Sequence, residues 1–297
     1  MTAPETPDPA TAISRSKPTT TVAVVQMTST ADVATNLARA AGLCRRARDR
    51  GAELAVLPEN FALMASDETL KYRHAVDLSA TTGAGEIVEH MRGVARELGL
   101  WLILGGLPAK SDSPSRVYNA CVALSPEGTI AAVYRKIHLF DVDFAAAATS
   151  LRESDTVAAG DPSQAVVLTT PWGGVGLSIC YDLRFPEFYR RLVAVGARVL
   201  SVPAAFTLHT GKDHWHVLLR ARAIENQCFV LAAAQQGRHS ASRTTYGHAL
   251  IVDPWGTVLA DCADGEGVAV AELDFAAQDR IRAELPCLRH RRILAPQ

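Results

Sequence analysis

Residues 175–187 read Val-Gly-Leu-Ser-Ile-Cys-Tyr-Asp-Leu-Arg-Phe-Pro-Glu, and the rest of the chain can be interpreted outward from them. The apolar first half is typical of a buried strand, and Pro186 stands where a proline can open a helix. Cys180 ends the apolar run, so a cysteine is predicted at a strand-to-helix turn. Free backbone N–H groups at such a turn point toward a bound molecule, and a thiol there can be accessible and activated. A lone cysteine can equally be inert core filler, and this stretch alone leaves both interpretations open.

The bulk composition is that of a globular protein without a general affinity for polyanions. The chain has 297 residues, of which 48% are hydrophobic, enough for a substantial core in one large domain or two ordinary ones. The formal net charge of -1 and the pI near 6.8 provide no general attraction to nucleic acid or to an anionic membrane. The expected partner is a small neutral or mildly charged molecule.

The six cysteines are spread singly along the chain, without a C-x-x-C pair. This spacing argues against a disulfide framework and against a zinc finger, so we expect reduced thiols and a cytoplasmic location. No apolar run approaches the length of a membrane span, and the N-terminus lacks a secretory pattern. Residues 1–19 are rich in Thr, Pro, Ala and Ser and are predicted to form a disordered tail, followed by a single domain over residues 20–297.

The first third of the chain predicts alternating strands and helices. Residues 21–27 are expected to form a buried strand, followed by a helix that starts near Val33 and ends at Gly51. Residues 54–57 form the next predicted strand, and Pro58 ends it. Glu59 therefore follows at the carboxyl edge of the sheet, where ligands of α/β folds gather. A solvated loop carboxylate is the alternative for Glu59.

The remaining pattern mixes hairpins with helices. After a helix over 87–98 and a strand over 101–104, hairpins are predicted at 117–135, 165–179 and 246–260, around turns such as Ser-Pro-Glu-Gly. Helices are expected over 186–195 and 213–226, and strands over 199–202, 229–233 and 268–273. We therefore predict one α/β domain of two packed sheets covered by helices.

Two further charged residues lie where chemistry is expected. Lys136 follows the strand that ends at residue 135, although a lysine leaving a strand can simply be an exposed charge. Glu153 lies in residues 137–163, which show no clear periodicity, and a connection of that length is often functional.

Several familiar signatures are absent or incomplete. The Gly-Ala-Gly at 83–85 does not continue into a dinucleotide motif, and the chain has neither a Walker A lysine nor a G-x-S-x-G serine. His209, His214 and His216 suggest metal ligands. Because the last two are two residues apart, they lie on different faces of a helix, and no metal site is predicted from them.

A papain-like pairing of a cysteine with a histidine is possible in principle. His138 and His248 could approach Cys180, but neither local signature of that family is present.

Glu59, Lys136, Glu153 and Cys180 together form a chemically complete set. Attack on an amide carbonyl needs a thiolate, a base for its proton, donors for the developing oxyanion and an acid for the departing nitrogen. A carboxylate can serve as base and then as acid, and a lysine with a backbone N–H can hold the oxyanion.

The chain resembles the carbon-nitrogen hydrolase (nitrilase) superfamily. The residues that carry the resemblance are Leu-Pro-Glu-Asn at 57–60, Tyr-Arg-Lys-Ile-His-Leu-Phe-Asp at 134–141 and Cys-Tyr-Asp-Leu-Arg-Phe-Pro-Glu at 180–187, which follow the order of its Glu, Lys and Cys motifs. Residues 218–227 and 246–256 extend the similarity to nearly everything after residue 20. The resemblance implies a four-layer αββα sandwich, assembly as homodimers or larger oligomers, and no metal or organic cofactor.

Within the superfamily the chain is most similar to the Nit-type amidases, which the resemblance links to deaminated glutathione and to ω-amides such as 2-oxoglutaramate. His-Leu-Phe-Asp at 138–141, His-Trp-His-Val-Leu-Leu-Arg-Ala-Arg at 214–222 and Leu-Pro-Cys-Leu-Arg-His-Arg-Arg at 285–292 favour deaminated glutathione. Residues 143–148, Asp-Phe-Ala-Ala-Ala-Ala, depart from the Pro-Gly usual there. An ω-amidase, an N-carbamoyl-amide hydrolase, a nitrilase and a non-catalytic interaction protein remain alternatives.

The resemblance also implies a role for each residue of the set. Cys180 attacks the amide carbon, and Glu59 takes the thiol proton and passes it to the leaving amine. Lys136 and the Tyr181 N–H stabilise the oxyanion, and Glu153 holds Lys136 or the substrate in position.

Three further residues are candidates for binding the substrate. Arg184 is expected to pair with a substrate carboxylate, with a salt bridge to Glu187 or another acid as the alternative. Phe206 and Thr207 follow a predicted strand end and are expected to line the same pocket.

Overall fold

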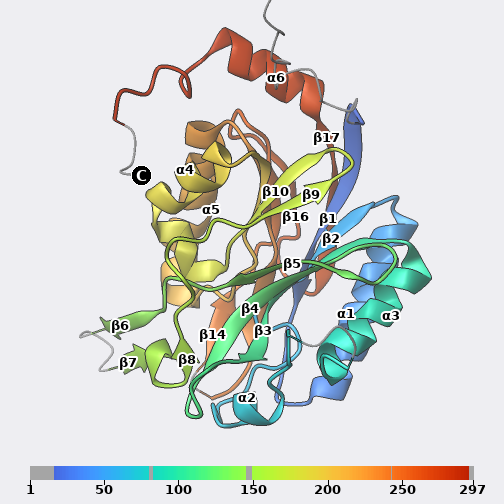
Figure 1. The fold of residues 1–297 in the computed structure, drawn as a ribbon, viewed down its shortest axis with the longest axis vertical. Coiled ribbons are helices and arrows are strands. Elements are labelled where there is room, and N and C mark those ends of the chain that lie inside the picture. Colours follow the sequence, from blue (N-terminus) through green and yellow to red (C-terminus); the bar gives the residue numbers. More distant parts are fainter. Residues whose placement is uncertain (1–16, 80–82, 145–148, 242, 294–297) are drawn as a thin grey trace, which may run out of the picture.

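The computed structural model describes residues 17–79, 83–144, 149–241 and 243–293. These residues form four layers, with two β-sheets in the middle and a pair of long helices on each outer side (Figure 1). The predicted αββα sandwich is confirmed. The predicted disordered tail lies for the most part outside the described residues, although β1 begins at Thr19 and Lys17 forms an ion pair with Glu53 at 2.7 Å.

The first sheet has nine strands in the described part of the chain. Its main path runs β14 (Thr244–Tyr246), β13 (Ala234–Arg238), β1 (Thr19–Met27), β2 (Leu54–Val56), β3 (Trp101–Lys110), β4 (Val117–Leu124) and β5 (Ile130–Arg135), while β17 (Gly267–Asp274) pairs with β1 and β8 (Val157–Ala158) with β4. β1, β2 and β3 are parallel, and β3, β4 and β5 are antiparallel. The parallel strands therefore direct their carboxyl ends toward one edge.

The second sheet runs β16 (Val258–Asp261), β15 (Leu250–Val252), β12 (Phe229–Ala232), β11 (Ala197–Ser201), β10 (Gly173–Leu177) and β9 (Val167–Thr170). Its central strands β10, β11 and β12 are parallel. A separate hairpin of β6 (Asp141–Phe144) and β7 (Thr149–Arg152) projects from the sandwich (Figure 1).

Two apolar cores hold the layers together, and successive residues of β1 point alternately into one core and the other. Val24 belongs to the core between the sheets, which continues under α4 (Pro186–Ala194) and α5 (Leu208–Asn226). The adjacent Val25 points to the opposite face and packs in the core under α1 (Val33–Asp49) and α3 (Glu86–Leu98). Because successive strand residues face opposite sides, a strand buried on both faces needs a continuous apolar run.

Two of the passages of the chain between the two sheets take only a few residues each, and the sequence did not indicate them. The prediction of one strand over 246–252 is wrong, because residues 247–249 leave β14 in the first sheet and enter β15 in the second. Gly247 and His248 adopt positive φ angles of 81° and 57°, which break the strand. Between β12 and β13 the chain makes the reverse passage.

Other differences from the sequence prediction concern polar or short elements. α5 begins at Leu208 rather than Asp213, because the Thr207 side chain accepts from the Thr210 N–H and caps it. Polar β13 and the helices α2 (Leu70–Arg73) and α6 (Phe275–Glu284) were not predicted. The unusual alanines at 145–148 lie outside the described residues. In the described ranges no helix combines the length and apolarity needed to cross a lipid bilayer.

Gly105 allows the segments that carry the predicted catalytic groups to approach one another. A Cβ there would lie 1.9 Å from the Leu57 carbonyl oxygen and 2.2 Å from Pro203 Cβ. We predict that Gly105→Ala lowers the free energy of unfolding by about 2 kcal/mol or more. The new Cβ would clash with backbone atoms, which cannot move aside as the end of a flexible side chain can. Gly93→Ala in α3 has no atom within 4 Å of the new Cβ and should stabilise by up to about 1 kcal/mol. Urea unfolding measures both, and equal midpoints for the two variants would contradict the packing argument.

Candidate active site

Three of the predicted residues meet in a buried ion-pair cluster between the sheets. Lys136 Nζ lies 3.0 Å from Glu59 Oε1 and 2.8 Å from Glu153 Oε2. Glu59 follows the carboxyl end of β2, Lys136 follows β5, and Glu153 follows the β6–β7 hairpin. Lys136 is only 2% exposed, so its prediction as a simple surface charge is excluded.

The charges of Lys136 and Glu153 hold each other in the ionised form. Burial by itself would lower the pKa of Lys136, but the carboxylates of Glu153 and Glu59 outweigh it and keep that pKa well above its ordinary value. Burial would likewise raise the pKa of Glu153, but the charge and the hydrogen bond of Lys136 reverse the shift and lower it. A positive charge therefore persists beside two carboxylates inside the protein.

Cys180 lies where β10 turns into a short 3-10 helix (Cys180–Arg184) that precedes α4. Its φ angle is +48°, a left-handed conformation uncommon for a residue with a Cβ, and its N–H donates to the Pro203 carbonyl at 2.9 Å. The predicted strand-to-helix turn is confirmed. A nucleophile on such a strained turn stands clear of the sheet.

The thiol of Cys180 is in electrostatic contact with the ion-pair cluster. Burial, and next the negative charge of Glu59, raise the pKa of Cys180 well above its ordinary value, while Lys136 and the Ala205 N–H oppose this shift. A hydrogen bond with the Glu59 carboxylate contributes to the same shift. The resting group is thus a protonated thiol next to a carboxylate, an arrangement in which the proton can leave as attack proceeds.

Tyr181 occupies the first turn of the 3-10 helix, where backbone N–H groups have no acceptor within the helix. Its ring packs edge-on against Phe140 and Phe185, with centroids 5.0 and 5.4 Å apart. These contacts fix the backbone next to Cys180, so the Tyr181 N–H keeps one direction.

Asn119 belongs to the site and was not predicted. Its Nδ2 donates to Glu59 Oε1 at 2.9 Å and to Glu153 Oε1 at 3.3 Å, so one amide bridges the two carboxylates. In the sequence, Asn119 is the one side-chain amide in the largely apolar strand β4. A buried amide of this kind requires a hydrogen-bond partner.

Asp182 is a second residue that sequence reasoning missed. Its fully buried carboxylate accepts from the Tyr134 hydroxyl and the Ile179 N–H at 2.7 and 2.8 Å, which anchors the turn that carries Cys180. His138 Nδ1 lies 2.7 Å from the same carboxylate, and its ring stacks on Phe185 at 3.7 Å. His138 is therefore a partner of Asp182, and no papain-like pairing with Cys180 is formed.

Arg184 lies against aromatic rings, without a carboxylate partner among the described residues. Its guanidinium is 5.9 Å from the Tyr181 ring centroid and 5.2 Å from that of Phe206, and Nη1 lies 3.2 Å from His214 Nδ1. The alternative of a salt bridge with Glu187 or another acid is therefore not formed among the described residues, where the contacts of Arg184 are aromatic rings and an imidazole. A guanidinium held by aromatic faces remains available for an anionic ligand.

Phe206 and Thr207 have different surroundings. Phe206 is buried between the Arg184 guanidinium and the Trp215 ring, whose centroid is 4.8 Å away. Thr207 uses its hydroxyl to cap α5, which is a structural contact. Contact of either residue with a substrate stays a prediction.

The arrangement supplies the parts of an acyl-transfer site. A thiol, an adjacent carboxylate, a buried ammonium and a backbone N–H converge from three segments of the chain. Such a set can form and hydrolyse a covalent acyl intermediate.

Comparison with known proteins gives consistent matches. The sequence profile of the carbon-nitrogen hydrolase family matches residues 21–283. A Bos taurus protein named deaminated glutathione amidase is 45% identical over 274 residues, which cover 91% of this chain and 81% of the relative. A Synechocystis protein of the same name is 44% identical over 270 residues, covering 91% of this chain and 97% of that protein.

Two solved structures have the same architecture. The NitFhit protein of C. elegans superposes with a TM-score of 0.85 at 40% identity, and the match covers 93% of this chain and 66% of that longer chain. Nit3 of Saccharomyces cerevisiae, described as a member of branch 10 of the nitrilase superfamily, superposes with a TM-score of 0.83 at 29% identity, covering 94% and 98%.

The lowered pKa of Glu153 leads to a prediction about acid stability. Because the folded protein lowers this pKa below its ordinary value of 4.5, the ionised carboxylate stabilises the fold above that pH, and the stabilisation is lost as the pH falls through the folded pKa. Between about pH 6 and pH 3.5, the free energy of unfolding of the wild type should therefore fall more steeply than that of Glu153→Gln. Urea unfolding at a series of pH values measures this difference. Parallel pH curves would show that the Lys136–Glu153 pair does not act as described.

Proposed function

The chain belongs to the carbon-nitrogen hydrolase family, and we propose that this enzyme is an amidase that hydrolyses deaminated glutathione through a thioester on Cys180. The single observation that carries the mechanism is the buried cluster in which Lys136 contacts Glu59 and Glu153, in electrostatic contact with Cys180. The names of the relatives support the substrate.

The first half of the proposed reaction forms the thioester. Cys180 Sγ attacks the amide carbon while Glu59 accepts the thiol proton, and an S–C bond forms. The carbonyl oxygen becomes an oxyanion, which is stabilised by the charge of Lys136 and by the Tyr181 N–H. When the C–N bond breaks, Glu59 returns the proton to the departing nitrogen, so the amine leaves neutral.

The second half releases the acid. Glu59, again a carboxylate, takes a proton from water as the water oxygen attacks the thioester carbon. Collapse of the second tetrahedral intermediate breaks the S–C bond, and the thiolate recovers the proton from Glu59. No metal or organic cofactor takes part in the proposed reaction.

Glu153 and Asn119 act as positioning residues in this proposal. Glu153 holds Lys136 with both carboxylate oxygens, and the Phe140 N–H fixes the same carboxylate at 2.8 Å. Asn119 donates to Glu59 and limits its rotation. Both contacts reduce the reorganisation that the reaction requires.

Arg184 is proposed to bind the carboxylate that the substrate carries near the scissile amide. The Tyr181 and Phe206 rings orient its guanidinium without neutralising it. Phe206 and Thr207 are proposed to line the same part of the pocket. An ω-amide such as 2-oxoglutaramate carries a similar anionic end, so it is the second candidate substrate for this guanidinium.

The biological setting completes the proposal. We place the enzyme in the cytoplasm, supported by six free cysteines, and its partner is the small amide rather than nucleic acid or membrane.

Homodimers or larger assemblies are proposed through the outer face of α5, where Val217 and Ile224 are exposed and separated by two helical turns. The sedimentation mass of the purified chain checks this assembly.

Mass spectrometry of single turnovers tests the proposed activity. The protein is mixed in parallel with deaminated glutathione, 2-oxoglutaramate, a carbamoyl amine and a nitrile, and both products and acylated Cys180 are followed. Deaminated glutathione should give the fastest turnover and an acyl adduct on Cys180. Cys180→Ala should lower turnover by at least about 10³-fold, since removal of a nucleophile abolishes the covalent route.

Cys287→Ala is the matched control, because it removes a thiol outside the site and should retain turnover. Undiminished turnover by folded Cys180→Ala would disprove the thioester mechanism. A folded wild type that turns over none of the four compounds would indicate a non-catalytic relative.

Arg184→Ala tests the recognition of the substrate carboxylate. A hydrogen-bonded charge pair contributes about 1.5–3 kcal/mol, so kcat/KM for the anionic amide should fall by about 10- to 150-fold, mainly through KM. The same amide with its carboxylate esterified should show little change, because the interaction that the variant loses is absent. Equal losses for acid and ester would instead assign Arg184 to positioning the Cys180 turn.

A further inference from the structure

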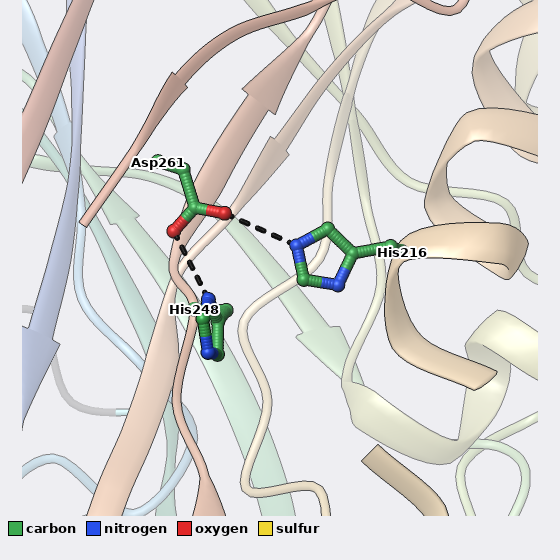
Figure 2. A group of neighbouring side chains, drawn as sticks. All are labelled: His216, His248 and Asp261. Atoms are coloured by element: carbon green, nitrogen blue, oxygen red, sulfur yellow. Dashed lines mark hydrogen bonds and ion pairs between the residues drawn. The ribbon is translucent and has the colours of Figure 1, made fainter. Parts of the chain in front are cut away.

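A second group of chemistry-bearing side chains lies outside the proposed active site. His216 on α5, His248 in the passage from β14 to β15 and Asp261 at the end of β16 point toward one another (Figure 2). His216 Nε2 lies 3.1 Å from Asp261 Oδ2, and His248 Nδ1 lies 3.3 Å from Asp261 Oδ1. We call these three residues the His-His-Asp cluster.

The backbone of His248 is held by contacts from outside the cluster. The Trp215 indole N–H donates to its carbonyl at 2.8 Å, and the following Ala249 N–H donates to Gln26 Oε1 at 2.7 Å. The Trp215 contact also ties α5, which carries His216, to the passage between the sheets. These bonds keep His248 at its unusual φ of +57° and direct its imidazole to Asp261.

Asp261 is oriented from the opposite side. Its Oδ1 accepts from the Ala263 N–H at 2.7 Å, and the Cys262 N–H donates to the Ala249 carbonyl at 2.9 Å. Metal-binding carboxylates are commonly held by such outer hydrogen bonds. The Tyr246 ring stacks on the His248 imidazole at 4.6 Å and limits its rotation.

The spacing of the donor atoms fits a tetrahedral divalent ion. Zinc binds imidazole nitrogen and carboxylate oxygen at about 2.0–2.2 Å, which places neighbouring donors about 3.3 Å apart. The two imidazole–carboxylate separations, 3.1 and 3.3 Å, are close to that value, although they run to different oxygens of Asp261. One donor atom from each of the three residues lies within 4.8 Å of the others, and side-chain rotations would bring these three atoms to the spacing of a shared ion.

The cluster is open enough for water to complete the coordination. The side chains of His216, His248 and Asp261 are 34%, 25% and 27% exposed, so an ion can enter from solvent. Two imidazoles and one carboxylate with a free position are a ligand set of zinc and of other borderline divalent metals, whereas magnesium and calcium prefer oxygen ligands alone.

The surrounding charge also favours a cation. Asp213 and Asp264 lie near enough to Tyr246, which stacks on His248, for their negative charges to act on its hydroxyl together with Asp261. The charge of these carboxylates would attract a divalent ion at the cluster.

The spacing of histidines along the sequence does not indicate this cluster, and no metal site is predicted from it. His214 and His216 do lie on different faces of α5, since His214 contacts Arg184 and His216 contacts Asp261. The partners of His216 come from the passage between β14 and β15 and from β16. Comparing helix positions alone could not reveal them.

We propose that His216, His248 and Asp261 bind one Zn²⁺ ion, with water at the remaining coordination position. The ion joins α5 to the second sheet at the point where the chain passes between the sheets. It is a structural site, separate from the proposed chemistry at Cys180. Without an ion, the carboxylate accepts a hydrogen bond from each imidazole, and this is the competing description.

Calorimetric titration of the full chain with ZnCl₂ distinguishes the two descriptions. The protein is first treated with a chelator and dialysed, and all titrations use a Cys180→Ala background so that the active-site thiol does not bind the probe. We expect one Zn²⁺ per chain and a thermal midpoint that rises with Zn²⁺ concentration, because the ion binds only the folded cluster. Co²⁺ should give the visible absorption of a tetrahedral complex.

The variants are chosen to retain the fold. His216→Ala and His248→Asn should each weaken Zn²⁺ binding by at least about 10-fold, and asparagine tolerates the left-handed conformation at position 248. His90→Ala removes an exposed histidine of α3 and should bind as the parent does. Stoichiometric binding that is insensitive to His216→Ala and His248→Asn, or no binding at all by the folded parent, would overturn the proposal in favour of a hydrogen-bonded cluster.

Discussion

The buried contact of Lys136 with Glu59 and Glu153 is the interaction on which the rest of the site depends. Removing an ammonium and two carboxylates from water is costly, and the cost is offset only when geometry and hydrogen bonds are nearly complete. Asn119 and the Phe140 N–H provide those additional bonds. Loss of one partner from such a buried pair typically costs about 3–5 kcal/mol, so the segments that carry these charges also hold one another in place.

This ionic cluster explains why the nucleophile can rest in its protonated form. The thiol of Cys180 lies next to the negative charge of Glu59, and burial adds to the rise of its pKa. A resting thiolate is therefore disfavoured. In the proposed mechanism the proton moves only as the oxyanion donors gain a charge to stabilise, and the same carboxylate that suppresses the resting thiolate becomes the base during attack.

Asp182 links this chemistry to the fold. By accepting from Ile179 and Tyr134, its carboxylate stabilises the turn that holds Cys180 at a positive φ angle. The surrounding rings of Phe185 and Phe188 pack against His138, which is bound to Asp182. Strain at the nucleophile is thus supported by a buried polar network within an apolar core.

The sequence by itself determined the fold class, most of the long strands and helices, and four residues of the site. Apolar periodicity is a local property, so β1, α3 and the turn at Cys180 could be predicted from neighbouring residues. Glu59, Lys136 and Cys180 stood out because each directly follows a strand or its apolar run. The convergence of Asn119 with Glu59, the anchoring by Asp182 and the meeting of His216 with His248 and Asp261 were decided only by the tertiary structure. These contacts join segments far apart in the chain, and they depend on which strands are neighbours and where the chain passes from one sheet to the other, neither of which local periodicity encodes.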